Sequence, residues 1–401
     1  MQGEHRDLRT GRTVWEAGGL PLLPRSDLRR NIETDILIVG AGITGAIVAD
    51  VLTQAGFTVA IAERRAPIRG STVASTALLL AEIDTPLTML ADRIGHRDAG
   101  RAWLRSRRSV HDLGRRAAGV SCDWARRDAL YLAGDVLDAG ALRKEAEARQ
   151  GIGWPCEYLG KKELQRDYGI ARDGAIRSSD NAEVDPVRLA AGFLRRALAR
   201  GARIFAPVEI TEVMPSPRQV TACARNGFAF KAAALIYATG YELPRLVPRA
   251  GHRVVSTWAM ATAPQPDPVW RSQSLIWEAS DPYLYMRSTR DGRVLIGGED
   301  EDFSNAAARD ALLVQKIATL ERKLHALLPV LDATAELAWT GSFGDSRIGL
   351  PAIGRLRGKP NCFAVLGFGG NGITFAMIAA QLLRGYLRGP RDPDSDLFAF
   401  K

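Results

Sequence analysis

The chain has 401 residues, of which 46% are hydrophobic and 25% are charged, and its formal net charge at pH 7 is +9. This composition is ordinary for a folded globular protein and excludes a disordered or collagen-like chain. The length suggests two or three domains. The four cysteines stand far apart in the sequence, which excludes a disulfide framework and a Cys-x-x-Cys metal site, so we expect no metal.

The positive charge comes mainly from scattered arginines, such as Arg105, Arg107 and Arg108, which alternate with apolar positions on an expected helix. A solvated helix face explains this pattern better than a nucleic-acid surface does, and no aromatic and basic platform for bases is visible. No apolar run reaches the ~18 residues of a membrane span. Because the first residues are also unlike a secretory signal, we expect a cytoplasmic protein with no membrane or nucleic-acid partner.

Residues 1–30 show no periodicity and predict an extended arm on the surface. The apolar run 36–39 predicts a strand that is buried on both faces. A helix is expected over 43–55, with Gly56 at its end, and a second strand over 58–62. Together these segments predict one βαβ unit.

Beyond this unit, residues 91–178 are expected to be mostly helical, with a strand at 129–132. Asp185-Pro186 predicts a helix start, with Asp as the N-cap and Pro at the first helical position. Strands are expected at 203–205, 232–238 and 362–366 and as a run over 253–300, with a hairpin turn at Asp291-Gly292. Helices are expected over 306–328 and from the last glycine-rich turn to about Leu387.

Three glycines stand between the first expected strand and helix in a Gly-x-Gly-x-x-Gly pattern. Gly40 permits the tight turn, Gly42 lets the backbone approach a pyrophosphate, and Gly45 lets the helix and strand pack closely. Glu63 ends the next strand, where its carboxylate can accept hydrogen bonds from the adenosine ribose hydroxyls. The pattern predicts a dinucleotide site, and it disfavours NADP because the carboxylate would repel a 2′-phosphate.

Two later turns favour FAD over NAD. The strand that ends at Ala238-Thr239-Gly240 suits a backbone that passes near the dinucleotide. The turn Gly369-Gly370-Asn371-Gly372 opens the C-terminal helix, whose positive dipole end would stabilise the negative charge of a reduced flavin. A nicotinamide has no such requirement, so a plain NAD-dependent dehydrogenase remains the weaker alternative.

With these motifs the chain resembles the D-amino acid oxidase-like family of FAD-dependent oxidoreductases, which includes glycine oxidase and sarcosine oxidase. The matching segments are 35–63, 70–77, 238–240, 291–298 and 349–374. The resemblance implies an α/β fold, α+β overall, with a Rossmann-like FAD-binding domain and a discontinuous substrate domain on a large mixed β-sheet. The implied FAD-binding domain comprises 31–88, 179–244 and 339–390, and the substrate domain 89–178 and 245–338, between an N-terminal arm (1–30) and a C-terminal tail (391–401).

The resemblance also implies a set of FAD contacts. Those toward the adenosine and the pyrophosphate are Gly40, Gly42, Ile43, Thr44, Gly45, Glu63, Arg64, Arg65 and Val208. Those along the pyrophosphate and isoalloxazine are Ser71, Thr72, Ser75, Thr76, Ala77, Ala238, Thr239 and Gly240, and those at the flavin pyrimidine edge are Gly369, Gly370, Asn371, Gly372, Ile373 and Thr374. No cysteine stands where relatives attach FAD covalently, so non-covalent binding is expected.

Members of this family oxidise a C–N bond by moving a hydride from the carbon to flavin N5, and the imine then hydrolyses. The resemblance therefore implies an FAD-dependent amine or amino acid oxidoreductase that passes electrons to oxygen or another acceptor. The expected strand 294–296 lacks the lysine by which sarcosine oxidase-like members speed the reaction with oxygen, so oxidase and dehydrogenase both stay open. The alternative is a flavoprotein subunit of a multi-component dehydrogenase or an RNA-modifying flavoprotein.

Strand alternation places Tyr283, Tyr285 and Arg287 on one face, where two phenols and a guanidinium would suit a substrate carboxylate. We assign these three residues to the catalytic site, although an ordinary solvent face explains the pattern equally well. Amino acid-oxidising relatives often carry an arginine at the place of Ser342, and this chain has none there. Arg347 or Arg287 is expected to take its place.

Two acidic residues follow the flavin-contact segment. Glu82 and Asp84 could meet a cationic amine, or they could cap a loop. The substrate thus stays open between an amino acid and an amine.

Overall fold

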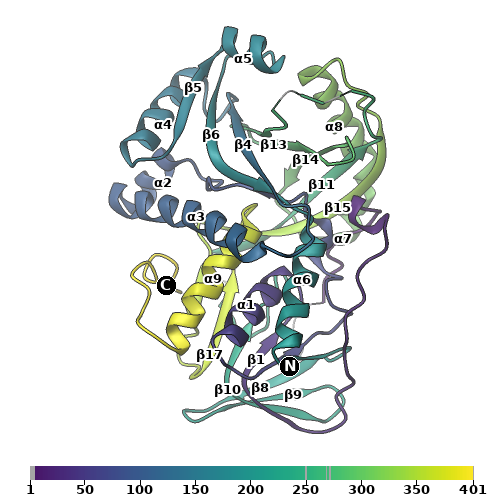
Figure 1. The fold of residues 1–401 in the computed structure, drawn as a ribbon, viewed down its shortest axis with the longest axis vertical. Coiled ribbons are helices and arrows are strands. Elements are labelled where there is room, and N and C mark those ends of the chain that lie inside the picture. Colours follow the sequence, from purple (N-terminus) through teal and green to yellow (C-terminus); the bar gives the residue numbers. More distant parts are fainter. Residues whose placement is uncertain (1–4, 249–250, 268, 271, 401) are drawn as a thin grey trace.

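The computed structural model describes residues 5–248, 251–267, 269–270 and 272–400, which build two β-sheets, one above the other in Figure 1. The first sheet has eight strands with a parallel centre, and the second has nine strands that are mostly antiparallel. The fold class predicted from the sequence, a Rossmann-like unit with a second large mixed sheet, is confirmed.

The centre of the first sheet is the strand that precedes the glycine motif. Its order is β16-β17-β10-β1-β2-β7, with the hairpin β8–β9 attached to β10. The strands are β1 (Ile32–Val39), β2 (Val59–Ala62), β7 (Arg203–Phe205), β8 (Ile210–Pro215), β9 (Val220–Ala224), β10 (Ala229–Tyr237), β16 (Ala352–Arg355) and β17 (Cys362–Leu366). The chain leaves β1 toward β2 on one side and returns as β10 on the other. This reversal creates a crevice at the carboxyl end of β1, where α/β sheets bind ligands.

Three helices pack together on this sheet: α1 (Ile43–Gln54), α6 (Pro186–Ala199) and α9 (Gly372–Leu387) (Figure 1). Helix α1 contacts both others, and its residues from Thr44 to Thr53 are all buried. Asp185 caps α6 as predicted, because its side chain accepts hydrogen bonds from the N–H groups of Val187 and Arg188.

The second sheet runs in the order β15-β11-β14-β13-β12-β4-β6-β3, with β5 beside β6. Its strands are β3 (Leu78–Leu79), β4 (Ala125–Leu132), β5 (Cys156–Gly160), β6 (Gly174–Glu183), β11 (His252–Thr262), β12 (Leu275–Glu278), β13 (Leu284–Ser288), β14 (Val294–Glu301) and β15 (Ala335–Ser346). The remaining helices are α2 (Leu87–Ile94), α3 (His96–Ala117), α4 (Ala139–Gly151), α5 (Lys161–Tyr168), α7 (Ala306–Ala311) and α8 (Leu313–Leu327), with short 3-10 turns η1 (Val14–Glu16) and η2 (Ser71–Ala74).

Three sequence predictions need correction. The segment 91–178 is mostly helical and contains the strand predicted at 129–132, as part of β4, but the prediction missed β5 and the start of β6. The helix expected over 306–328 is divided into α7 and α8 at Leu312. The domain boundaries stay a prediction, but the junction placed at residue 339 falls inside the continuous strand β15.

The described part of the N-terminal arm, from residue 5, joins the two sheets. Ser26 forms a parallel bridge with Phe205 of the first sheet, and Gly11 forms an antiparallel bridge with Trp339 of the second. Leu8 and Leu28 of the arm are buried. The arm lies along the surface as predicted, with most of its described residues exposed or half-buried, and it is anchored at its buried residues.

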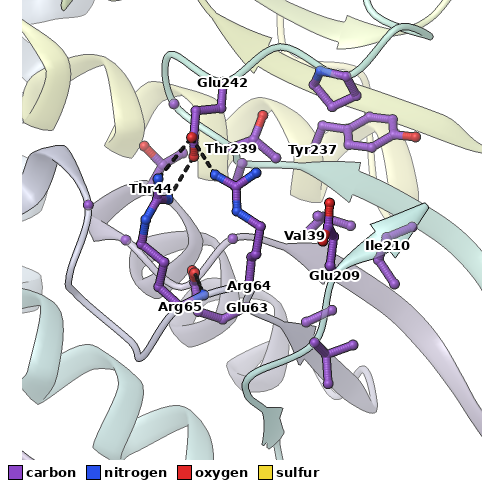
Figure 2. Close-up of a pocket in the computed structure, with 18 of the residues that line it drawn as sticks. Val39, Thr44, Glu63, Arg64, Arg65, Glu209, Ile210, Tyr237, Thr239 and Glu242 are labelled. Carbon is purple, nitrogen blue, oxygen red and sulfur yellow. Dashed lines mark hydrogen bonds and ion pairs between the residues drawn. The ribbon is translucent and has the colours of Figure 1, made fainter. Parts of the chain in front are cut away.

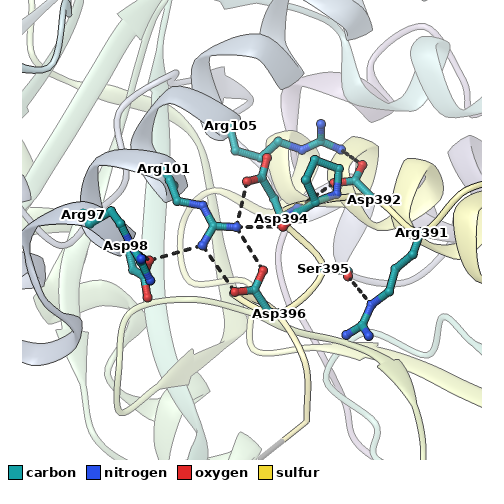
Figure 3. Close-up of polar contacts among 10 residues, drawn as sticks. Arg97, Asp98, Arg101, Arg105, Arg391, Asp392, Asp394, Ser395 and Asp396 are labelled. Atoms are coloured by element: carbon teal, nitrogen blue, oxygen red, sulfur yellow. Dashed lines mark hydrogen bonds and ion pairs between the residues drawn. The ribbon is translucent and has the colours of Figure 1, made fainter.

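The C-terminal tail is fixed to α3 by ion pairs (Figure 3). Arg101 contacts Asp394 at 3.2 Å and Asp396 at 3.0 Å, and Arg105 contacts Asp392 at 3.0 Å. The three aspartates occur at every second position of the tail, so one side of the tail faces Arg101 and Arg105 of α3.

An apolar anchor completes the attachment of the tail. The ring of Phe398 is fully buried, its centroid lies 6.5 Å from that of Phe375 in α9, and its carbonyl accepts the Ile353 N–H at 2.6 Å. The tail thus closes the end of the first sheet.

No helix in the described ranges has both the length and the apolar character needed to cross a bilayer. Within those same ranges, no group of His, Cys, Asp and Glu side chains is arranged to hold a metal ion.

We expect Phe398→Ala to lower the free energy of unfolding by about 3–5 kcal/mol, because the truncation leaves a cavity in a closed core. Leu22→Ala is the control, since Leu22 is 86% exposed and its loss should cost less than about 0.5 kcal/mol. Urea unfolding measures both variants. Equal, small effects would show that the tail does not anchor the first sheet.

Candidate functional site

Two cavities meet at the carboxyl end of β1. The first, of about 320 Å³, lies over the ends of β1, β2 and β10, and the second, of about 150 Å³, lies between η2 and the second sheet. Both are lined by Ile43, Thr44, Ser71, Thr72 and Gly240, so they form one trough that runs from the first sheet to the second. An extended molecule such as a flavin dinucleotide fits such a trough.

The glycine loop lies at the floor of the first cavity. Gly40 has a φ of +112°, and a Cβ there would overlap the Ala238 carbonyl oxygen. A Cβ at Gly45 would overlap the Gly40 carbonyl oxygen, so α1 begins where only glycine fits. Gly42 differs, because a Cβ there would meet only the Thr72 hydroxyl, at 3.2 Å, and Gly42 itself lines the cavity. Its missing side chain leaves room for a ligand.

The Glu63 carboxylate ends β2 at the cavity wall. Its Oε2 accepts the Ala41 N–H at 2.8 Å, and its Oε1 accepts the Arg65 N–H at 2.7 Å. The two backbone groups fix the carboxylate in place and leave further lone pairs for hydroxyl donors. Val208 also lines this cavity, but its N–H donates to the Glu63 carbonyl at 2.7 Å, which leaves its own carbonyl as the backbone group for an adenine.

An acidic residue that the sequence prediction missed organises the adjacent wall. Glu242 accepts hydrogen bonds from both Arg64 and Arg65 (Figure 2) and from the Arg6 N–H of the arm at 2.9 Å. Burial raises the pKa of Glu242, but the hydrogen bonds from Arg65 and Arg6 outweigh it and hold the pKa below its ordinary value. The only feature of the sequence that could have pointed to Glu242 is its position, two residues after the predicted turn 238–240.

The arm and the second sheet both brace the segment that follows the glycine loop. Trp15 donates from Nε1 to the Ser75 carbonyl at 2.8 Å, and Trp339 donates to the Ala74 carbonyl at 2.9 Å. Leu8 of the arm lines the first cavity directly. Residues 71–77 are therefore held from outside, with Ser75, Thr76 and Ala77 facing the second cavity.

The C-terminal glycine turn closes the second cavity. Gly369, Gly370, Gly372 and Ile373 line it. Asn371 and Thr374 do not, because their side chains hold the strand β3 and its loop: Asn371 donates to the Glu82 carbonyl at 2.9 Å and Thr374 to the Leu80 carbonyl at 3.0 Å. The side chains of these two residues therefore position the turn.

Aromatic side chains of the second sheet form the opposite wall. Tyr283 and Tyr285, predicted as site residues, both line the cavity, and their ring centroids are 5.3 Å apart. Trp277 and Tyr241 join them. Burial raises the pKa of Tyr283 and of Tyr285 far above the ordinary value, so both phenols stay protonated at neutral pH.

The position of Arg287 in the structure does not suit the carboxylate-binding role that the sequence predicted for it. It is 3% exposed, lies outside both cavity linings and donates to the carbonyls of Thr76 at 2.8 Å and Val184 at 3.1 Å. Its guanidinium also pairs with Glu183 at 3.3 Å. Because strand β13 buries this face under residues 71–77, Arg287 supports the Thr76 backbone instead of lining the trough.

The expected contacts therefore fall into two groups. Those that line the trough are Gly40, Gly42, Ile43, Thr44, Glu63, Arg64, Arg65, Ser71, Thr72, Ser75, Thr76, Ala77, Val208, Ala238, Thr239, Gly240, Gly369, Gly370, Gly372, Ile373, Tyr283 and Tyr285. Those outside its lining are Gly45, Asn371, Thr374 and Arg287. Three features of the trough together fit FAD. They are a glycine loop at the start of a helix, a fixed carboxylate at one end and a flat aromatic wall at the other end.

Comparisons with known proteins agree with this geometry. The family model described as FAD dependent oxidoreductase (DAO) matches residues 35–385. The chain is 24% identical over 378 residues to gamma-glutamylputrescine oxidoreductase of Escherichia coli, covering 91% of this chain and 86% of that protein. It is 25% identical over 365 residues to glycine oxidase of Geobacillus kaustophilus, covering 87% and 91% respectively.

Solved structures show the same fold. The crystal structure of the Geobacillus kaustophilus glycine oxidase matches with a TM-score of 0.73 at 22% identity, over 92% of this chain and 99% of that one. The L-proline dehydrogenase of P. horikoshii matches with a TM-score of 0.76 at 15% identity, over 92% and 97%.

We expect Gly42→Val to fold but to lose FAD, because the structure has room for a Cβ at this position while the branched side chain would fill the ligand space. The matched control is Gly151→Val, where a Cβ meets nothing within 4 Å. The ratio of flavin absorbance to protein absorbance after purification measures the effect. Full flavin content in a folded Gly42→Val protein would remove this loop from the site.

A second prediction concerns pH and the buried carboxyl of Asp300 in β14. Burial raises the pKa of Asp300 from 3.8 to about 7. Between pH 3.8 and about pH 7, the Asp300 carboxyl is protonated in the folded chain and ionised in the unfolded chain. The free energy of unfolding therefore falls as the pH rises through this range, by roughly 1.4 kcal/mol per pH unit.

Asp300→Asn removes this titration. Relative to the variant, the wild type should therefore lose unfolding free energy between pH 5 and pH 7, as measured by urea unfolding at saturating FAD. The same pH slope in both proteins would contradict the burial of this carboxyl.

Proposed function

Because the chain belongs to the FAD dependent oxidoreductase (DAO) family, we propose that it oxidises the C–N bond of an amine or amino acid, with FAD held non-covalently. The observation that carries the proposal is the trough itself, in which a dinucleotide cavity opens into an aromatic-walled pocket between the two sheets.

The reaction balances as a two-electron oxidation. The substrate R–CH2–NH2 loses a hydride from carbon and a proton from nitrogen, which leaves the imine R–CH=NH, and water then converts the imine to a carbonyl compound and ammonia. Bound FAD would supply the hydride acceptor at N5, with oxygen or another electron acceptor taking up the electrons.

The chain's own residues hold and enclose the reactants. Arg287 fixes the Thr76 carbonyl from behind, and Trp15 fixes that of Ser75, so the backbone beside the flavin is rigid. Tyr283 and Tyr285 line the opposite wall of the second cavity, where they would exclude water from a bound flavin. The protonated phenols can donate hydrogen bonds. They do not form phenolates at neutral pH, so neither tyrosine acts as a general base there.

Non-covalent attachment rests on the placement of the cysteines. Cys122 and Cys362 are buried, and none of the four cysteines lines either cavity. Cys362 lies within β17, where no thiol reaches the trough.

We expect the purified protein to be yellow and to release all of its flavin into the supernatant on acid precipitation. The yellow protein should then lose its colour under anaerobic conditions when mixed with its substrate from a panel of amines, amino acids and N-methyl amino acids. Return of the colour on admission of air would identify oxygen as the acceptor. A colourless protein that binds no added FAD would sink the proposal, and colour in the pellet would contradict non-covalent binding.

A further inference from the structure

The charge of the second cavity is unusual for a pocket that would receive an amino acid. Among the described residues that line it, Asp84 is the only charged side chain, and there is no Arg, Lys or His. The rest of the lining is aromatic, small or hydroxyl-bearing, including Tyr241, Tyr283 and Trp277. A substrate carboxylate would thus find no cation there and would face a negative charge.

Asp84 is fixed with one oxygen directed at the C-terminal turn. Its Oδ2 accepts the Gly370 N–H at 2.6 Å, and its own N–H donates to Asn371 at 3.0 Å. No described residue donates a hydrogen bond to its other oxygen, Oδ1. Burial and, to a lesser degree, the nearby Asp345 raise the pKa of Asp84 to about 6, against the lowering effect of the hydrogen bond from the Gly370 N–H.

A second carboxyl lies behind the tyrosine wall. Asp300 interacts electrostatically with Tyr283, Tyr285 and Asp84. The Thr257 hydroxyl is placed to hydrogen-bond with it and lowers its pKa, but among the described residues no basic side chain forms an ion pair with it. Its neighbour Thr257 lines the cavity. A buried carboxylate without a cationic partner is costly, and a cation in the adjoining space would offset that cost.

The basic residues near this cavity are already committed elsewhere. Arg287 is paired with Glu183 and backbone carbonyls, as described above. Arg309, fully buried behind the cavity wall, pairs with Asp310 at 2.9 Å and donates to the Ser342 hydroxyl at 2.9 Å. Arg347 is exposed and lies outside both linings. None of these offers a free guanidinium to a carboxylate in the pocket.

We propose that the second cavity selects a cationic amine without a carboxylate, and that Asp84 is the group that receives its ammonium. The ammonium lies against the Oδ1 side of Asp84 in a charge-assisted hydrogen bond, which the low dielectric of the pocket strengthens. The faces of Tyr241, Tyr283 and Trp277 add cation–π attraction. This inference rests on the proposed function and narrows its substrate class from amines and amino acids to amines.

The test uses the yellow holoenzyme and two probes of nearly the same shape and opposite charge. tert-Butylammonium has no hydrogen on the carbon next to nitrogen, so it binds without being oxidised, and pivalate carries a carboxylate in place of the ammonium. Perturbation of the flavin absorbance and isothermal titration calorimetry at pH 7.5 give the affinities. We expect tert-butylammonium to bind at least 10-fold more tightly than pivalate.

The variant Asp84→Asn keeps an oxygen for the Gly370 N–H but removes the charge. It should retain FAD and bind tert-butylammonium about 10- to 100-fold more weakly, as the loss of one charge-assisted bond predicts. The matched control is Asp173→Asn, whose exposed carboxylate pairs with Lys161 away from both linings and whose loss should change neither affinity.

Tighter binding of pivalate than of tert-butylammonium would overturn the inference, as would an unchanged amine affinity in Asp84→Asn. Neither result would contradict the proposed function, which depends on bound flavin and on its bleaching by some amine or amino acid. A protein that holds no flavin fails the proposed function first, and this is seen before any probe is added.

Discussion

The whole site depends on the close packing of the first turn of α1 against the end of β1. Gly45 packs against the Gly40 carbonyl oxygen at a distance that no side chain would allow. This contact places the start of α1, with its free N–H groups and positive dipole end, directly at the floor of the first cavity. Thr72 then binds the Ile43 N–H, which ties the flavin-contact segment to the same point.

From that point the trough is built by segments that are far apart in the sequence. The arm braces residues 71–77 from one side through Trp15, and the second sheet braces them from the other through Trp339. The C-terminal turn 369–372 closes the far end against Asp84. The adenosine end is polar and fixed by backbone groups, whereas the far end is aromatic and negative. This asymmetry is what the proposed binding of a dinucleotide and a cationic amine in one trough requires.

Much of the dinucleotide end was predictable, because a glycine loop, a strand-ending carboxylate and a helix cap are local patterns. The substrate end was not, since it is formed by side chains whose direction depends on sheet pairing. Alternation placed Arg287 beside Tyr285 on one face, yet only the structure shows that Glu183 and the Thr76 carbonyl occupy its guanidinium. Strand β6 was missed because arginine, serine and aspartate interrupt its apolar residues. Glu242 and Asp300 carry no local motif at all.

The most direct test of the account is the choice of cofactor by the apoprotein. Titration with FAD, FMN and NAD, followed by flavin fluorescence and calorimetry, separates the contribution of the adenosine end from that of the flavin end. Because we assign Glu63, Val208 and the glycine loop to the adenosine half, we predict one FAD per chain, bound at least about 100-fold more tightly than FMN, a difference of about 2.7 kcal/mol. Equal affinity for FMN and FAD, or NAD binding that displaces FAD, would contradict it.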